Sequence, residues 1–567
     1  MSDPIIELRN VSFRYPGADE DTLRNVNLAI SEGDVVSVVG GNGSAKTTLC
    51  KTFNGLIPHY WQGEFAGVAE VCGIDTFTSS VAELSSHVGY VYQDFQNQLV
   101  RPTVRDEIAF GPVNFGLADH RERTAEALEM LRITELADKF VWQLSGGQAH
   151  LAALASVLAL RPRIIVVDEP VAELDPARAT EIYERLEVLN REFGLTVVTI
   201  EHHAEFIARY AQSVVLMSGG APVWHLPVQE AVNRSAELAE HGIPAPQIVQ
   251  AAQALGLADA PRTVPDAARA LAHLPVDPTP EPETGTEGAS ISEPVASARN
   301  VTFSYNTVLG RRQVVLDGLN VDIRRGDRVA LVGGNGSGKT TLLKLLAGIT
   351  VPRRGEVIVD GINTRQRSAS ELADHVAYLW QHPQQMFVKE SIERDIALFP
   401  EERGVEGWEG LVTDTLDQVR LSGFADRDGR TLSGGQQRRA TLGIGLAMRP
   451  TLLLADEPTA SLDVTSREAV TVMLSELATD GTMSSVVATH DMSLVAEWAT
   501  RVLVLEGGTV IGDLTPGALF ARPDLLERAN LVPPQITQLG HALGITPPPL
   551  NVADFVSRIR KESHHGA

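Results

Sequence analysis

The stretch VALVGGNGSGKTTL, residues 329–342, decides the fold of the domain around it. It begins with a short apolar run of the kind that forms a buried strand, and the residues from the lysine onward have helical character. A strand, a glycine loop and a helix form the context in which the pattern GxxxxGK[ST] binds phosphate, because consecutive backbone N–H groups then face the anion at a helix N-terminus. The stretch therefore predicts a phosphate-binding loop in an α/β domain.

A second copy of this loop, VSVVGGNGSAKTTL, occupies residues 36–49, with Ala45 in place of a glycine. Three later pairs, the LSGGQ glutamines, the DEP aspartates and a histidine after each DEP motif, all lie 288 positions apart. The loop lysines lie 293 apart, because the first copy is longer at LIPHYWQGEFAGVAEV, residues 56–71. A unit of about 240 residues is too long for a solenoid repeat, so each copy is expected to fold alone.

The predicted boundaries follow from this duplication and from a segment rich in Pro, Glu, Gly, Ser and Thr between the copies. That segment has too few large apolar residues to offset its ordering entropy, which predicts a flexible linker. The expected divisions are a first domain at 5–242, its C-terminal extension at 243–274, the linker at 275–294, a second domain at 295–530, and an extension with a tail at 531–567.

Composition limits the classes of function. The chain has 567 residues and a net charge of −24, so it is expected to repel nucleic acid, and no nucleic-acid partner is predicted. No apolar run is long enough for a membrane helix, and the N-terminus does not read as a signal peptide. The two cysteines, Cys50 and Cys72, give no disulfide framework and fit a reducing cytoplasm. Cys50 could be a redox sensor, although a small buried hydrophobe is the favoured interpretation.

Charged residues in matched positions predict the chemistry. Lys46 and Lys339 are expected to reach the β- and γ-phosphates of a nucleotide. The pairs Asp168–Glu169 and Asp456–Glu457 end apolar runs, which places them at the mouth of parallel strands, where ligands bind. The aspartates fit ligands of Mg²⁺ or its water, and the glutamates fit the base that orients attacking water. The residues therefore predict that Thr47 and Asp168 bind the metal in the first copy, and Thr340 and Asp456 in the second.

Two further motifs are less specific when taken singly. His202 and His490 each follow a β-branched run and could hold the γ-phosphate and the catalytic water, or be structural; their matched spacing favours the catalytic role. LSGGQ could be a simple turn, or glycines that let the backbone approach a nucleotide, with Ser145 or Ser433 donating to the γ-phosphate.

The order of GGNGSGKTT, Gln381, LSGGQ, LLLADEP, SLD and His490 resembles that of the ATP-binding cassette (ABC) ATPases, over nearly all of both copies. The resemblance implies two tandem P-loop domains, each with a core parallel sheet, an antiparallel β subdomain and a helical subdomain. It also implies that ATP and Mg²⁺ are bound where the phosphate loop of one copy meets the LSGGQ of the other, so that one chain supplies both halves of each site. The resemblance further implies that Gln93 and Gln381 belong to the metal-binding residues of the two copies. The implied ATP-binding residues are Gly40, Gly41, Asn42, Gly43, Ser44, Ala45, Lys46, Thr47, Thr48, Tyr15, Gln93, Ser145, Gly146, Gly147, Gln148 and Asp175 in the first copy, and Gly333, Gly334, Asn335, Gly336, Ser337, Gly338, Lys339, Thr340, Thr341, Tyr305, Gln381, Ser433, Gly434, Gly435, Gln436 and Asp463 in the second.

A narrower resemblance comes from YQDFQNQLVRPTVRDEIAFGPVNFGL, residues 92–117, which is similar to the ATPases of energy-coupling factor (ECF) transporters. QHPQQMFVKESIERDIAL, residues 381–398, is a weaker copy. The resemblance implies a peripheral protein at the cytoplasmic face of the cell membrane, working with a membrane scaffold (T component) and a substrate-binding membrane protein (S component) to import a vitamin or metal ion. The alternatives are a sugar-importer ATPase and, less favoured, a soluble ABC protein that acts on ribosomes. A DNA-repair ATPase would need long coiled coils, and no sustained heptads occur.

The two copies differ at three points. Ala45 is expected to keep a helical backbone conformation, with its methyl group facing the phosphates. The first LSGGQ continues as AHLAA and the second as QRRAT, and Glu201 stands where the second copy has Thr489. Because both glutamates and both histidines remain, two working but unequal sites are predicted. The tail histidines, His564 and His565, could bind metal, but a frayed terminus is favoured.

Overall fold

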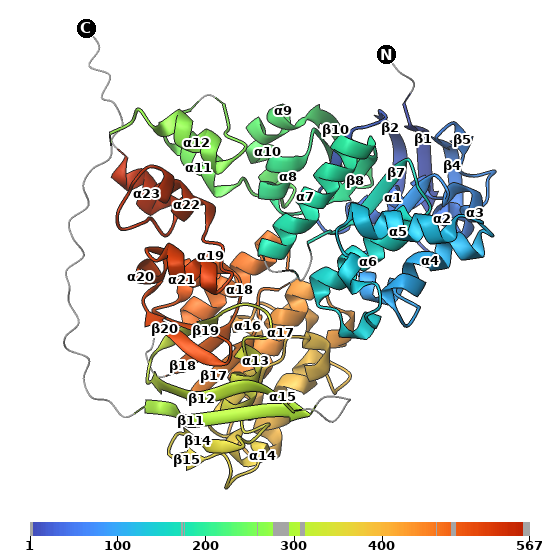
Figure 1. Cartoon of the computed structure of the whole chain (residues 1–567). Coiled ribbons are helices and arrows are strands. Elements are labelled where there is room, and N and C mark those ends of the chain that lie inside the picture. The colour runs from blue at the N-terminus through green and yellow to red at the C-terminus, as the bar shows by residue number, and fades with distance from the viewer. Residues whose placement is uncertain are drawn as a thin grey trace. The chain divides into compact units, whose positions relative to one another are not determined.

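The computed structural model describes residues 4–171, 174, 176–257, 259–275, 294–306, 312–460, 462–477 and 483–559. The chain divides into two compact units, Met1–Ala267 and Ala268–Ala567 (Figure 1). Nearly all of the predicted linker lies outside the described residues, as do Asp175 and the tail histidines.

The main sheet of the first unit has six strands in the order β10-β9-β3-β8-β7-β6. Five of them are parallel, and β10 is an antiparallel strand at the edge, so the sheet is mixed rather than purely parallel. The central strands are buried along their whole length, as their apolar, β-branched sequences predict. The bounds are β3 (Val35–Val39), β6 (Val88–Val91), β7 (Ile164–Asp168), β8 (Thr196–Ile200), β9 (Ser213–Ser218) and β10 (Ala221–Pro227).

A second sheet of the first unit is antiparallel, in the order β2-β1-β4-β5. Helix α1 (Lys46–Phe53) contributes Leu49 and Phe53 to one buried cluster that also contains residues of both sheets. The phosphate loop is therefore fixed at both of its ends by the core. The strands are β1 (Ile6–Arg14), β2 (Leu23–Ile30), β4 (Glu64–Val71) and β5 (Ile74–Asp75).

Helices α4 (Val104–Asn114), α5 (His120–Met130) and α6 (Gly146–Leu158) pack on one another and form the helical part of the first unit. Their apolar faces share a buried cluster with α7 (Pro176–Phe193) and with one face of the main sheet. Shorter elements complete the unit: α2 (Leu56–His59), α3 (Val81–Leu84), η1 (Phe95–Gln98), η2 (Thr134–Leu136), η3 (Val141–Gln143), α8 (Ala204–Tyr210), α9 (Val228–Asn233), α10 (Ser235–Glu240), α11 (Gln247–Ala254) and α12 (Val264–Leu271).

The second unit repeats this topology. Its six-stranded sheet has the order β16-β17-β18-β13-β19-β20 and its antiparallel sheet the order β12-β11-β14-β15. The strands are β11 (Pro294–Asn306), β12 (Arg312–Arg324), β13 (Arg328–Val332), β14 (Arg354–Val359), β15 (Ile362–Asn363), β16 (Val376–Leu379), β17 (Leu452–Asp456), β18 (Ser484–Ala488), β19 (Arg501–Glu506) and β20 (Thr509–Leu514).

Its helical part is built from α15 (Ile392–Glu402), α16 (Trp408–Gln418) and α17 (Gly434–Ala447), which share a buried cluster. The predicted fold class, with a core sheet, an antiparallel β subdomain and a helical subdomain in each copy, is confirmed. The remaining elements are α13 (Lys339–Leu346), α14 (Ala369–Leu372), η4 (Pro383–Met386), η5 (Ser422–Phe424), η6 (Gly429–Thr431), α18 (Val464–Leu477), α19 (Met492–Trp498), α20 (Pro516–Phe520), α21 (Pro523–Arg528), α22 (Gln535–Ala542) and α23 (Val552–Arg558). In the described part of the chain, none of the helices combines the length and apolar character needed to span a bilayer.

Candidate functional site

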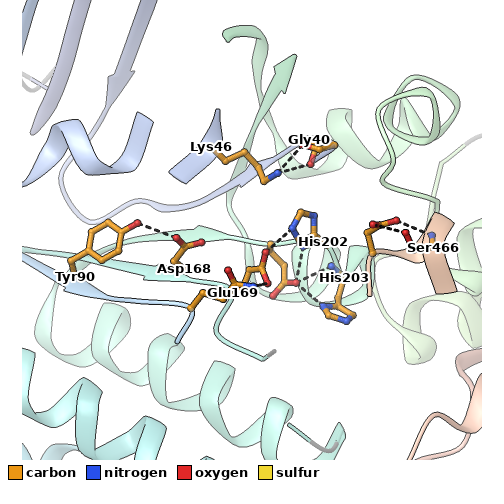
Figure 2. A network of polar contacts seen from close by, with 12 residues as sticks. Gly40, Lys46, Tyr90, Asp168, Glu169, His202, His203 and Ser466 are labelled. Carbon is orange, nitrogen blue, oxygen red and sulfur yellow. Dashed lines mark hydrogen bonds and ion pairs between the residues drawn. The ribbon is translucent and has the colours of Figure 1, made fainter. Parts of the chain in front are cut away.

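Each phosphate loop connects the central strand of its main sheet to a buried helix, and its lysine folds back over the loop. Lys46 Nζ donates to the carbonyl oxygens of Gly40 and Gly41 at 2.8 and 3.0 Å (Figure 2). Lys339 makes the equivalent bonds in the second unit at 2.7 and 3.3 Å. The lysine ammonium group is therefore held by backbone carbonyl groups of its own phosphate loop.

Buried polar atoms in the loops fit a phosphate ligand. The hydroxyl oxygens of Ser44 and Ser337 are buried and have no hydrogen-bond partner among the described residues. Such groups are costly to bury unless something binds them. The backbone packs closely beside them, since a Cβ on Gly40 would lie 2.3 Å from the carbonyl oxygen of Met217. The glycine is therefore required by packing as well as by its φ of 144°.

The expectation for Ala45 is wrong in both respects. Its φ is 76° and its ψ 22°, which is the left-handed region rather than the helical one, because the residue forms the turn before α1. Its methyl group packs against the buried cluster between the two sheets and not into the phosphate cradle. In the second unit, Gly338 has a φ of 106°, and a Cβ there would approach Leu316 of β12. The substitution therefore strains the backbone of the loop instead of crowding the ligand.

The motif aspartates end strands β7 and β17 in buried positions. Tyr90 donates its hydroxyl hydrogen to Oδ2 of Asp168 at 3.1 Å, and Tyr378 does the same for Asp456 at 3.0 Å. The other oxygen of Asp456 accepts from the Thr340 hydroxyl at 3.2 Å. Burial raises the pKa of both aspartates, and the adjacent motif glutamates raise it further. A buried carboxylate beside a threonine hydroxyl is a set of hard oxygen donors, which fits Mg²⁺.

The glutamate and histidine of the first unit lie in direct contact. His202 Nε2 is 2.9 Å from Glu169 Oε1 (Figure 2). Gln93 donates from Nε2 to Glu169 Oε2 at 2.6 Å. Glu169 has a φ of 50°, and its backbone N–H bonds to the carbonyl oxygen of Ile200 on β8. A strained backbone at a carboxylate held by two polar partners is typical of functional sites.

The second unit brings the equivalent pair together in a different way. His490 Nδ1, rather than Nε2, is 3.0 Å from Glu457 Oε2, and Glu457 has a φ of 49°. Burial lowers the pKa of His490, but the hydrogen bond and charge of Glu457 outweigh it, so the net shift is upward. Both units thus form a carboxylate–imidazole pair next to the phosphate loop, with opposite ring nitrogens.

The LSGGQ motifs begin the long helices α6 and α17. Ser145 caps α6 by accepting from the backbone N–H of Gln148, whose side chain accepts from the backbone N–H of Ser145. Ser433 and Gln436 form the same capping box in α17. The two glycines that follow each serine occupy the first turn of the helix, whose backbone N–H groups have no partner within the helix, as an anion site requires.

Aromatic residues lie beside both phosphate loops. The hydroxyls of Tyr15 and Tyr305 are 3.3 and 3.4 Å from the Thr48 and Thr341 hydroxyls, on the phosphate-loop helices. The ring of Trp61, from the longer segment of the first copy, packs edge-on against Tyr15. Asp463 accepts from the backbone N–H and the hydroxyl of Ser466, both at 2.9 Å.

Sequence reasoning missed the tyrosines that hold the motif aspartates. Tyr90 and Tyr378 are 288 positions apart and lie three residues before Gln93 and Gln381, so the repeat register itself carried the signal. The prediction that Cys50 is a small buried residue is confirmed, because its side chain is inaccessible and burial raises the pKa of its thiol.

Comparison with known proteins gives consistent results. The family model described as ABC transporter matches residues 23–172 and 316–460. An ABC transporter ATP-binding protein of Methanosarcina mazei is 32% identical over 95% of this chain and 94% of its own length. Another, from Caldanaerobacter subterraneus subsp. tengcongensis, is 31% identical over 98% of this chain and 99% of its own length. Among solved structures, cbiO1 from Clostridium perfringens, part of the ABC transporter complex cbiONQ, is 30% identical over 42% of this chain and 96% of its own, with a TM-score of 0.38.

Proposed function

Because this chain belongs to the ABC transporter family, as an ATP-binding subunit with two cassettes, we propose that it hydrolyses ATP to energise uptake through an ECF-type importer. The cargo class we propose is a vitamin or metal-type micronutrient. The observation that carries the hydrolytic part is the carboxylate–imidazole pair beside each phosphate loop, Glu169–His202 and Glu457–His490.

The chain's own residues account for the attack on the γ-phosphate. The lysine and the loop N–H groups bind the phosphates, and the orphaned serine hydroxyls supply further donors. The glutamate of each pair is the base that orients water and accepts its proton, and the histidine holds the glutamate and the γ-phosphate in position. Gln93, bonded to Glu169, connects this site to the surface at η1.

Mg²⁺ would be held by Thr47 and Asp168 in the first site and by Thr340 and Asp456 in the second, and when bound it supplies charge neutralisation at the phosphates. The tyrosine hydroxyl on Oδ2 keeps each aspartate in one orientation. In the second unit this leaves Oδ1 facing Thr340.

Exposed apolar side chains in the ECF-like segment of the first unit support docking to membrane proteins. We call these side chains the coupling face. Its residues are between 38% and 62% exposed and lie within or directly beside the ECF-like segment: Tyr92, Val100, Phe110, Val113 and Phe115. Exposed apolar side chains concentrated in one short segment are typical of interaction surfaces.

Two of the five equivalent positions of the second unit are charged. Val113 and Phe115 correspond, at the offset of 288, to Glu401 and Arg403. Asn97 and Gln98 have internal roles, since Asn97 bonds to Asp94 and Gln98 bonds to the backbone of Tyr90 and Tyr92. We therefore propose that the main membrane contact is made by the apolar side chains of the first unit, with Asn97 and Gln98 shaping the segment at η1.

The function is tested by co-purification and coupled uptake. The tagged chain is isolated from membranes and from ribosome fractions, alongside Val100→Glu/Phe115→Glu and a matched control, Phe193→Glu, which alters an exposed phenylalanine at the end of α7. We expect wild type and the control to retain membrane scaffold and substrate-binding proteins. The coupling-face variant should lose both the partners and the uptake while keeping its basal ATP hydrolysis, because the change lies away from the phosphate loop.

Each outcome distinguishes a class. Recovery with ribosomes and without membrane proteins would contradict the proposal. Recovery with membrane proteins that import sugars would keep the ABC transporter assignment and refute the ECF type. Unchanged uptake by the coupling-face variant would show that the contact lies elsewhere.

A further inference from the structure

A buried carboxylate organises the turn that carries His202. The Glu201 side chain is only 1% exposed and its Oε1 accepts from the backbone N–H groups of His202 and His203, both at 2.8 Å. The same oxygen is 2.7 Å from His203 Nδ1. Tyr183 donates its hydroxyl hydrogen to Oε2 at 2.5 Å. One carboxylate therefore binds four groups, and three of them belong to the two residues that follow it.

These contacts keep Glu201 charged. Burial by itself raises the pKa of Glu201, but the charge of His203 and the hydrogen bonds from His203 and Tyr183 outweigh it, so the net shift is downward. A carboxylate that accepts backbone N–H bonds forms charge-assisted bonds, which are stronger than neutral ones. The turn from β8 to α8 is thus built around an ionised group.

The second unit builds the same turn from different residues. Thr489 stands at the position of Glu201, and its hydroxyl accepts from the backbone N–H of Asp491 at 3.0 Å. Asp491, at the position of His203, caps α19 by accepting from the N–H groups of Ser493 and Leu494. In the first unit, the N-cap residue of α8 makes no side-chain cap of this kind. The acidic side chain is thus at the helix cap in the second unit, and two positions earlier, directly after strand β8, in the first unit.

The different hydrogen bonds of the two turns coincide with a different orientation of the histidine ring. His202 faces its glutamate through Nε2, whereas His490 faces its glutamate through Nδ1. The ring nitrogen that points away from the glutamate is therefore different in the two sites. Since the backbone N–H of His202 bonds to Glu201, the carboxylate acts directly on the residue whose ring orientation differs.

The same carboxylate connects the turn to α7. Tyr183 lies on α7, its ring stacks on Phe206 at 4.8 Å and on Tyr210 at 5.0 Å, and both of these belong to α8. At the positions of Tyr183 and Phe206 the second unit has Thr471 and Leu494, so this aromatic stack is specific to the first unit. Glu201 is therefore fixed from two sides, by its own turn and by a packed helix pair.

We propose that Glu201 is the positioning residue of the first site: its carboxylate shapes the turn that presents His202 to Glu169, a task that Thr489 and Asp491 share in the second site. This inference rests on the proposed function, because it takes His202 to be part of the hydrolytic machinery.

The test replaces the turn residues of the first site with those of the second. In a Glu457→Gln background, turnover reports on the first site. We compare Glu201→Thr, Glu201→Gln, and Glu201→Thr combined with His203→Asp, which recreates the residues of the second unit. Each single change should lower kcat by at least about tenfold while KM for ATP stays within about twofold, because binding is kept and orientation is lost. The double variant should recover to within about threefold of the background, as coupled residues do.

Two controls distinguish a failure of the positioning role of Glu201 from a failure of the proposed role of His202. Glu240→Gln removes an exposed carboxylate of the same unit and should change neither constant. His202→Ala in the same background must lose turnover; if it does not, the proposed role of His202 fails. If His202→Ala loses turnover but both single Glu201 variants keep it, or if the folded double variant stays as slow as Glu201→Thr, the positioning role is wrong. Thermal unfolding identifies any variant that does not fold. If Glu201→Thr fails to fold, the turnover of Glu201→Gln, which preserves side-chain size, decides whether Glu201 has the positioning role.

Discussion

At the scale of single residues, position 45 separates the two phosphate loops most clearly. Both loops need a left-handed residue before the helix, and the first supplies it with alanine at a φ of 76°. Alanine in this region costs about 1–2 kcal/mol, whereas glycine adopts it freely. The methyl contact with the core offsets part of this cost.

We predict that Ala45→Gly raises the free energy of unfolding of the first unit by up to about 1 kcal/mol, since relief of strain exceeds the extra entropy of an unfolded glycine. Nucleotide affinity should stay within about twofold, because the methyl group lies on the core side of the loop. Denaturant titration and nucleotide-binding measurements check both values.

The reciprocal change in the second unit is the control. Gly338→Ala should destabilise by about 1–3 kcal/mol, since its Cβ would lie 2.6 Å from Leu316 Cδ2 and 3.2 Å from the Val315 carbonyl oxygen. A large gain in affinity for Ala45→Gly at unchanged stability would instead place the methyl group against the phosphates.

At the scale of elements, helix α6 is joined to η1 by a buried histidine. The ring of His150 stacks on Phe95 at 4.7 Å, and neither ring nitrogen has a hydrogen-bond partner among the described residues. In the second unit Arg438 stands at this position and donates to the carbonyl oxygen of Trp380 at 3.1 Å. The first unit thus fixes the segment after Gln93 by stacking, whereas the second unit holds the residue before Gln381 by a hydrogen bond.

This contact makes the first unit sensitive to acid. Burial lowers the pKa of His150 from 6.5 to about 4, so the folded state favours the neutral ring. The stabilisation is complete above pH 6.5 and is lost as the pH falls towards 4, because the unfolded chain takes up the proton first. Between pH 7.5 and pH 5 we predict a loss of roughly 2 kcal/mol of unfolding free energy.

His150→Leu provides the comparison. Denaturant unfolding of the first unit, measured for both proteins at the two pH values, should show a smaller pH dependence in the variant by about that amount. Equal pH dependence in the two proteins would mean that the ring is already accessible to protons in the folded state.

At the scale of the whole molecule, two copies of one fold carry differently built sites. The phosphate loops differ at Ala45, and the turns that carry His202 and His490 differ in the position of their acidic group. The coupling face is more apolar in the first unit. Both copies nonetheless keep the lysine, the motif aspartate, the glutamate and the histidine. We therefore expect both sites to hydrolyse ATP, at different rates.

The prediction is checked by removing each lysine in turn. Lys46→Ala and Lys339→Ala should each lose most of the turnover, since the loop then lacks the charge that reaches the phosphates. The comparison uses steady-state hydrolysis and nucleotide binding on the full chain. If Lys46→Ala kept wild-type turnover, the first site would serve to hold the two cassettes together rather than to hydrolyse ATP.

The sequence by itself determined the fold class, the duplication and most of the candidate site. Each phosphate loop, DEP motif and histidine follows a contiguous apolar strand, so local pattern and spacing carry the information. The repeat register then paired each motif residue with its counterpart.

Only the tertiary structure decided the backbone conformation of Ala45, the hydrogen bonds from tyrosines to the motif aspartates, and the hydrogen bonds of Glu201. The first depends on how a turn joins a strand to a helix packed between two sheets, and the others on contacts between elements distant in sequence, such as Tyr183 with Glu201. Local propensity cannot report on such contacts, because packing of the whole unit sets side-chain directions and the φ of a single turn residue.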